Sequence, residues 1–206
     1  SVAIRESGKD RGVGVERGAG YTRSMVSRRV PDPAVDALEG LHSDVDAQVA
    51  PLVALHASRL RCARGCSGCC VDDLTVFEVE AARIIRHHAE LLAHAEPHPP
   101  GACALLDDEG ACRIYPDRPY VCRTQGLPLR WLEEAEIATH ARAEGEAIEM
   151  RDICPLNEEG GPPVETLTAD TCWTIGPFED RLARLQVAQD DGQGRRVRLR
   201  DLFSRR

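Results

Sequence analysis

The sequence predicts an α+β fold, a mainly helical single domain with an irregular cysteine-rich lobe. Residues 33–60 and residues 77–92 place apolar side chains at the three- and four-residue spacing of amphipathic helices. Seven of the nine cysteines fall in short, turn-rich segments between residues 62 and 122. A chain of 206 residues is also long enough to bury one substantial core.

The first thirty residues lack hydrophobic periodicity and hold four glycines between residues 12 and 20. Residues 1–30 are therefore predicted to be a flexible arm, and residues 31–206 to form the domain. The glycines resemble a phosphate-binding loop, but no strand pattern precedes them and no helix pattern follows.

Residues 33–60 are predicted to be two helical pieces joined by a kink at Pro51, because proline lacks the amide hydrogen that a helix interior needs. The second long helix is predicted to start at Thr75-Val76-Phe77-Glu78, which has the form of a capping box, and to end before Pro97. His88 falls on its apolar stripe. We expect it to be a packed core residue bonded to backbone rather than a metal ligand.

Residues 103–112 are predicted to form a tight hairpin, because an acidic turn closed by Gly110 separates their two ends. The hairpin would bring Cys103 and Cys112 side by side. Pro119 is well placed in the first turn of a short helix.

Further along the chain, extended segments are predicted at residues 127–132 and 146–153, and a helix at residues 177–189. Six arginines crowd residues 195–206. We interpret that stretch as a solvated tail or an amphipathic terminal helix rather than a nucleic-acid contact, because aromatic stacking partners are scarce.

The formal net charge of −8 argues against binding to nucleic acid or to an anionic membrane. The chain has no run of about eighteen apolar residues, and its first twenty residues lack the apolar core of a signal peptide. We therefore expect a cytoplasmic protein without a nucleic-acid or membrane partner; its protein partner stays unknown.

Four cysteines fall within nine residues, in the segment Cys62-Ala-Arg-Gly-Cys66-Ser-Gly-Cys69-Cys70. Thiolates at this spacing on a glycine-containing loop can converge on one metal ion. Disulfides are the alternative. The odd number of cysteines, the missing signal sequence and the adjacent Cys69–Cys70 pair weigh against them.

The candidate metal ligands are every cysteine except Cys172, namely Cys62, Cys66, Cys69, Cys70, Cys103, Cys112, Cys122 and Cys154. A zinc site and an iron–sulfur cluster each take about four cysteines, and the spacing does not decide between them. Side chains of adjacent residues tend to diverge, so Cys69 and Cys70 favour two ligand sets or a multinuclear centre. One centre with spare buried thiols is the other hypothesis.

Arginines flank three of the cysteine segments, at Arg61, Arg64, Arg113, Arg118 and Arg123. Four thiolates on a divalent ion leave about two negative charges. We expect these arginines to offset that charge through N–H···S contacts.

These residues resemble the YkgJ-like zinc- or iron-chelating cysteine-cluster family, which is described by a CxxxCxxCC pattern. The pattern here is Cys62, Cys66, Cys69 and Cys70. The likeness covers about residues 60 to 160 and continues in Glu78, Cys103-Ala-Leu-Leu, Cys112-Arg-Ile-Tyr115, Arg118-Pro119-Tyr-Val-Cys122-Arg123 and Cys154-Pro-Leu-Asn157. The resemblance implies metal chelation, with zinc or iron left open.

Some members of that family are flagellin lysine N-methylases, which implies an alternative: a metal-dependent enzyme that uses S-adenosylmethionine. The chain departs from such an enzyme because it shows no convincing methyl-donor loop. Its cysteine spacing from Cys62 to Cys69 also matches the radical S-adenosylmethionine motif, but Gly68 holds the place of the usual aromatic residue. No catalytic residues are assigned.

Overall fold

The computed structural model describes residues 31–134 and 147–203, and the predicted arm at residues 1–30 lies outside them. The described helices are α1 (Asp32–Leu55), α2 (Glu78–His94), α3 (Tyr120–Arg123) and α4 (Pro177–Val187). The strands are β1 (Thr75–Phe77), β2 (Leu129–Glu134), β3 (Ala147–Asp152), β4 (Trp173–Thr174) and β5 (Arg196–Arg198). The predicted mainly helical α+β fold is thereby confirmed.

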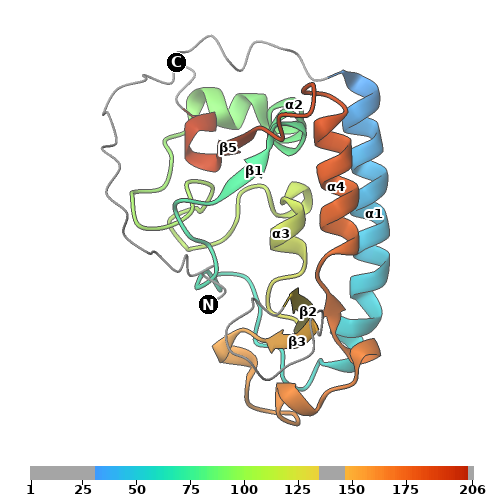
Figure 1. Cartoon of the computed structure of the whole chain (residues 1–206). Helices are drawn as coiled ribbons and strands as arrows, with labels where there is room; N and C mark the ends of the chain where they lie inside the picture. The colour runs from blue at the N-terminus through green and yellow to red at the C-terminus, as the bar shows by residue number, and fades with distance from the viewer. Residues whose placement is uncertain (1–30, 135–146, 204–206) are drawn as a thin grey trace, which may run out of the picture.

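Short 3₁₀ turns connect these elements, namely η1 (Tyr115–Asp117), η2 (Pro155–Asn157), η3 (Val164–Thr166), η4 (Ala169–Thr171) and η5 (Leu199–Leu202). Strands β1 and β5 form a small antiparallel pair, while β2 lies between antiparallel β3 and parallel β4. Helices α1 and α4 run side by side along one edge of the molecule (Figure 1). Cys122 lies in α3, and the other cysteines lie in the segments between the helices and strands.

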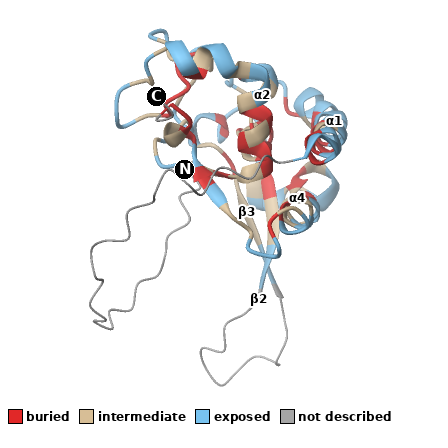
Figure 2. Cartoon of the chain, turned by 90° about the horizontal axis from the view of Figure 1, so that it is seen from above, coloured by how far each residue is buried: buried red, intermediate tan, exposed pale blue. Residues whose placement is uncertain are grey.

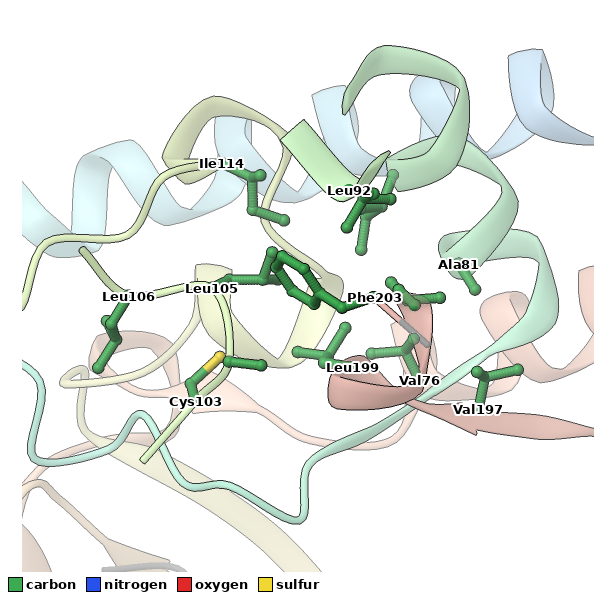
Figure 3. Close-up of a cluster of buried hydrophobic side chains, with 13 residues drawn as sticks. Val76, Ala81, Leu92, Cys103, Leu105, Leu106, Ile114, Val197, Leu199 and Phe203 are labelled. Carbon is green, nitrogen blue, oxygen red and sulfur yellow. The ribbon is translucent and has the colours of Figure 1, made fainter. Parts of the chain in front are cut away.

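Two hydrophobic clusters hold these parts together. The first, here the helical core, packs apolar faces of α1 and α4 around the aromatic rings of Tyr120, Trp173 and Phe178. The second, here the lobe core, joins α2, β1 and β5 to the segment that contains Cys103 (Figure 3). Helix α2 lies in the middle of the molecule and contributes buried residues to both clusters (Figure 2).

Helix α1 runs without interruption through Pro51, so the prediction of two pieces joined by a kink is wrong. Pro51 comes only four residues before the end of the helix at Leu55. Its missing amide hydrogen therefore removes a single helical hydrogen bond close to a terminus, where the loss costs least. The predicted remainder of the helix forms turns at residues 56–60.

The predicted capping box at the start of α2 is also wrong, because Thr75 belongs to strand β1. The helix begins at Glu78, and the carboxylate of Glu80 accepts a hydrogen bond from the Phe77 amide. Glu80 also accepts from the amide of Tyr120 at 2.9 Å. One buried carboxylate thus joins the start of α2 to the start of α3.

His88 is neither fully packed nor bonded to backbone, contrary to the prediction. Its Nε2 lies 2.7 Å from a carboxylate oxygen of Asp117 in η1. The backbone of His88 leaves helical geometry, with φ −128° and ψ 29°, so α2 bends at this residue. The bend turns the imidazole toward η1 and away from the apolar stripe.

The arginine-rich stretch does not form a solvated tail between residues 195 and 203. Phe203 is the last residue described in this region. Val197 in β5 and Leu199, Leu202 and Phe203 after it are all buried in the lobe core. Strand β5 pairs with β1 in the register Val76↔Val197. Arg195, which precedes Val197, pairs with Glu78, and Arg200, between Leu199 and Leu202, pairs with Asp72.

The other predicted elements are confirmed, with β2 and β3 at the expected extended segments, α4 within the predicted helix and α3 directly after Pro119. No helix within residues 31–134 and 147–203 combines the length and apolar character that a membrane crossing requires.

Candidate metal centre

The first four cysteines lie on a loop between α1 and β1 that has no regular secondary structure. Two tight turns shape it, since the amide of Cys66 donates to Ala63 and the amide of Cys70 donates to Ser67. The Cys103 amide then donates to the carbonyl of Cys70 at 2.9 Å. This bond joins the loop to the second cysteine segment, so residues far apart in sequence share one lobe.

Residues 103–112 form the predicted tight turn, although they build only one isolated bridge, between Leu106 and Cys112. The carboxylate of Asp107 stabilises the turn by accepting hydrogen bonds from two backbone amides ahead of it, at Glu109 and Ala111. Cys103 and Cys112 lie near enough for the charge of Cys112 to affect the pKa of Cys103.

The cysteines fall into two groups of neighbours. In the first, burial raises the pKa of Cys62, and the nearby charges of Cys66, Cys154 and Cys69 raise it further. Cys154 comes from the segment just after β3, so the fold brings it back to the first loop over more than ninety residues of sequence. These four thiols are here called the outer group.

The second group, here the inner group, consists of Cys70, Cys103, Cys112 and Cys122. Burial raises the pKa of the Cys122 thiol, and the charges of Cys103 and Cys112 raise it further. The hydrogen bond with Cys69 and then burial raise the pKa of Cys70, to which Cys103 and Cys122 also contribute. The thiols with a raised pKa therefore stay protonated more readily than a free cysteine unless a cation offsets the charge, namely those of Cys62, Cys70, Cys103, Cys112 and Cys122.

Cys69 and Cys70 join the two groups. The Cys70 thiol donates a hydrogen bond to the sulfur of Cys69, and this bond lowers the pKa of Cys69 to about 6. Cys69 also affects the pKa of Cys62 and of Cys122, and Cys122 in turn affects the pKa of Cys70, so the two adjacent thiols share a neighbour. Because the two side chains hydrogen-bond to each other, the predicted divergence of Cys69 and Cys70 is wrong.

All nine cysteines are free thiols, so none of them forms a disulfide. Across the described ranges, no set of three or more His, Cys, Asp or Glu side chains stands ready as it is to hold a metal ion. Cys172 belongs to neither group, because Arg151 approaches its sulfur at 3.5 Å and no cysteine affects its pKa.

Asn157 belongs to this site, although nothing in the sequence predicts a role for it there. It is completely buried, and its amide donates to the carbonyl of Gly126 at 2.8 Å and to the sulfur of Cys62 at 3.5 Å. Its side-chain oxygen accepts from the Arg61 amide. A single side chain thus holds Arg61 and Cys62 against Gly126, which only the Cys154-Pro-Leu-Asn157 resemblance could have signalled.

Arg59 in turn fixes the segment that contains Asn157. Its guanidinium donates to three carbonyls, those of Asn157 at 2.9 Å, Glu158 at 3.0 Å and Pro162 at 3.1 Å. The residue is 1% exposed. Arg59 thus holds the segment that contains Asn157, although it is not one of the five arginines that flank the cysteines.

Those five arginines make no hydrogen bond to a cysteine sulfur in the described structure, so the predicted N–H···S contacts are wrong for them. Arg64 pairs with Glu109, Arg113 donates to backbone carbonyls, and Arg123 donates to Asp46. The positive charges of Arg118 and Arg113 still lower the pKa of Cys112, against the larger effect of burial. Arg113 and Arg118 therefore affect the Cys112 thiol through their charge rather than through a hydrogen bond.

Gly126 is expected to be essential for the outer group. It has φ +90°, and a Cβ on this residue would overlap the sulfur of Cys62 and lie 3.2 Å from the Asn157 amide nitrogen. Gly126→Ala should therefore displace Cys62 and lower the metal bound per chain, in addition to a backbone strain of about 1–2 kcal/mol. Elemental analysis together with urea unfolding measures both effects.

The matched control is Gly192→Ala. Gly192 has a similar φ of +82°, and a Cβ there would meet nothing within 4 Å. This variant should show the backbone strain alone and keep its metal. Equal metal content in the two variants would contradict a role for Gly126 at the thiols.

Comparison with known families finds one match. Residues 61–155 match the CxxCxxCC family, whose description reads "Putative zinc- or iron-chelating domain". No curated protein and no solved structure matches the chain. The matched segment begins one residue before Cys62 and ends one residue after Cys154, so it contains both thiol groups and leaves out Cys172. Over residues 61–155, the chain is thus similar to a family described as zinc- or iron-chelating.

Proposed function

We propose that this chain holds two metal centres, one bound by the outer group of Cys62, Cys66, Cys69 and Cys154 and one by the inner group of Cys70, Cys103, Cys112 and Cys122. The observation that supports the proposal is that the thiols lie close enough to affect one another's pKa, with Cys66, Cys69 and Cys154 acting on Cys62, and Cys103, Cys112 and Cys69 acting on Cys122. Four cysteines is the number that a tetrahedral zinc site or an iron–sulfur cluster takes. The domain then extends over residues 31–206, since both hydrophobic cores support it.

The chemistry of the two groups suits such a centre. A thiol must lose its proton to bind metal. A cation of charge +2 would offset the negative charge of the buried thiolates that result. The Asn157 amide at Cys62 and the positive charges of Arg113 and Arg118 near Cys112 would offset part of the remaining negative charge.

Metal analysis of the full chain tests the proposal. Protein purified anaerobically without added metal should contain either two zinc ions and no colour, or iron with acid-labile sulfide and visible absorption. Two zinc ions would indicate a protein that binds or handles metal. Iron with acid-labile sulfide would indicate an iron–sulfur protein. A protein that holds one centre would contradict the proposal.

Serine variants assign the ligands. Cys66→Ser should remove one metal centre, because the outer group then keeps three thiols. Cys172→Ser is the matched control and should keep both, because Cys172 has no cysteine neighbour that affects its pKa. Loss of metal in the control variant, or none in Cys66→Ser, would overturn the assignment.

The alternative of a lysine methylase that uses S-adenosylmethionine stays a prediction from the resemblance. No contact among the described residues favours it, and the glycines between residues 12 and 20 lie outside the described ranges. Cytoplasmic localisation fits the proposal, since a reducing compartment keeps thiols available for metal.

A further inference from the structure

One histidine of helix α1 is buried without a hydrogen-bond partner. His42 is 3% exposed, and neither its Nδ1 nor its Nε2 has a partner among the described residues. A carboxylate oxygen of Glu80 in α2 lies 3.9 Å from Nε2, which is longer than a hydrogen bond. Because the large majority of buried polar side-chain atoms are paired in folded proteins, His42 departs from the usual pattern.

Two buried arginines face the same imidazole. Arg83 of α2 and Arg123 of α3 both act on His42 through their positive charges. The Nε atom of each guanidinium also lacks a hydrogen-bond partner within residues 31–134 and 147–203. Three buried side chains, one from each of α1, α2 and α3, thus carry unsatisfied nitrogen atoms at one place, here called the helix junction.

The acidic groups of the helix junction are already bonded to other donors. Glu80 accepts hydrogen bonds from two backbone amides. The remaining carboxylates lie against the two arginines, namely Asp46 at 2.5 Å from Arg123, and Asp117 at 2.6 Å and Glu39 at 3.7 Å from Arg83. A proton added to His42 would therefore meet two positive charges and only one carboxylate, whose oxygens are engaged elsewhere.

These surroundings keep the imidazole neutral. Burial lowers the pKa of His42 below its usual value of 6.5, and the positive charges of Arg123 and Arg83 act in the same direction, while Glu80 offsets part of the effect. An imidazole that reaches water binds a proton near pH 6.5, whereas the buried one does not. Opening the helix junction therefore becomes more favourable as the pH falls below about 6.5, and gains nothing above that pH.

We propose that the helix junction is a pH-sensitive switch, closed while His42 is neutral and opened in mild acid by proton uptake at that residue. Helix α1 packs against both α2 and α3. Glu80, which faces His42, also holds the start of α3 through the Tyr120 amide. A change at His42 thus reaches all three helices. This inference goes beyond the proposed function and does not depend on any metal.

Urea unfolding of the full chain between pH 7 and pH 5 tests the switch. His42→Leu and His42→Gln are two variants that cannot take up this proton, and either one suffices if the other fails to fold. Lowering the pH from 7 to 5 should raise the unfolding equilibrium constant of the wild type by about tenfold relative to the variants. One proton bound on unfolding changes that constant by at most about tenfold per pH unit.

The comparison isolates His42 because the other titratable groups, the thiols included, are the same in all these proteins. His94→Gln is the matched control, since His94 belongs to α2 and its side chain is 75% exposed. This variant should keep the pH dependence of the wild type.

Hydrogen exchange at the Tyr120 amide gives a local readout, because this amide donates to Glu80. After correction for the intrinsic effect of pH, its exchange should increase by about tenfold from pH 7 to pH 5 in the wild type and stay constant in His42→Leu. An equal pH dependence in the wild type and both His42 variants would overturn the switch. A wild type that gains stability over the variants in acid would also overturn it, because Glu80 would then hold a protonated His42 in the closed junction.

Discussion

Replacing Cys122 with serine is expected to remove the inner metal and to lower the melting temperature by about 10 °C or more. Structural zinc contributes about 10–16 kcal/mol of apparent binding free energy at pH 7 in small domains. In a domain of about 200 residues, each kcal/mol moves the melting temperature by about 2–4 °C. A loss of only a third of that binding energy would therefore produce the expected shift.

The large effect follows from where Cys122 lies. It belongs to α3, whose start is held to α2 through the hydrogen bond from the Tyr120 amide to Glu80. Its neighbours Cys103 and Cys112 belong to, or pack against, the lobe core. The inner metal would tie α3 to that core, so its loss should loosen both.

Calorimetry and elemental analysis of the same samples check this prediction, with Cys62→Ser as the matched control. Both variants should carry one metal fewer than the wild type. Only Cys122→Ser should melt much earlier, because Cys62 lies on an exposed loop. Equal melting temperatures for the two variants would show that the inner centre has no special structural role.

Arg59→Ala is expected to reduce the free energy of unfolding by about 3–5 kcal/mol. The guanidinium makes three hydrogen bonds to carbonyl oxygens, and its removal leaves the buried Asn157 carbonyl without that donor. Hydrogen bonds to charged groups contribute about 1.5–3 kcal/mol each, and an unpaired buried acceptor costs about 1–3 kcal/mol. The three bonds share one side chain, so their effects do not simply add.

The same variant should weaken the outer metal site, because Asn157 depends on Arg59 and donates to Cys62. Ser58→Ala is the matched control, since the neighbouring hydroxyl donates one exposed hydrogen bond to Gly160 in the same segment. Urea unfolding with zinc titration should show a change of about 1 kcal/mol or less for the control. If Arg59→Ala unfolds no more easily than Ser58→Ala, the guanidinium does not hold this segment.

Local signals in the sequence predicted the elements that local forces build. The turn around Asp107 and Gly110, the helix from Pro177 and the short helix after Pro119 each carry their own turn or helix-start residues, and all three form. The clustering of the thiols was likewise visible, because Cys62 to Cys70 share one short loop. Such features need little information from distant parts of the chain.

The sequence did not predict the features that depend on contacts between residues far apart in the chain. Strand β5 exists because Val197 finds Val76 across 121 residues of sequence, and nothing near Val197 signals that partner. His88 left the apolar stripe because Asp117 supplied a carboxylate. The distribution of thiols between the outer and inner groups depends on the return of Cys154 to the first loop, which spacing alone does not specify.

The pairing of β1 with β5 has a consequence for the order in which the protein is made. The lobe core needs Val197, Leu199, Leu202 and Phe203, so it is incomplete until residue 203 has been synthesised. At about 5–20 residues per second, roughly 6–25 seconds separate the synthesis of β1 from that of β5. The cysteines from Cys62 onward are thus made before the core that shelters the inner group, and we expect them to depend on the reducing power of the nascent chain's surroundings during that interval.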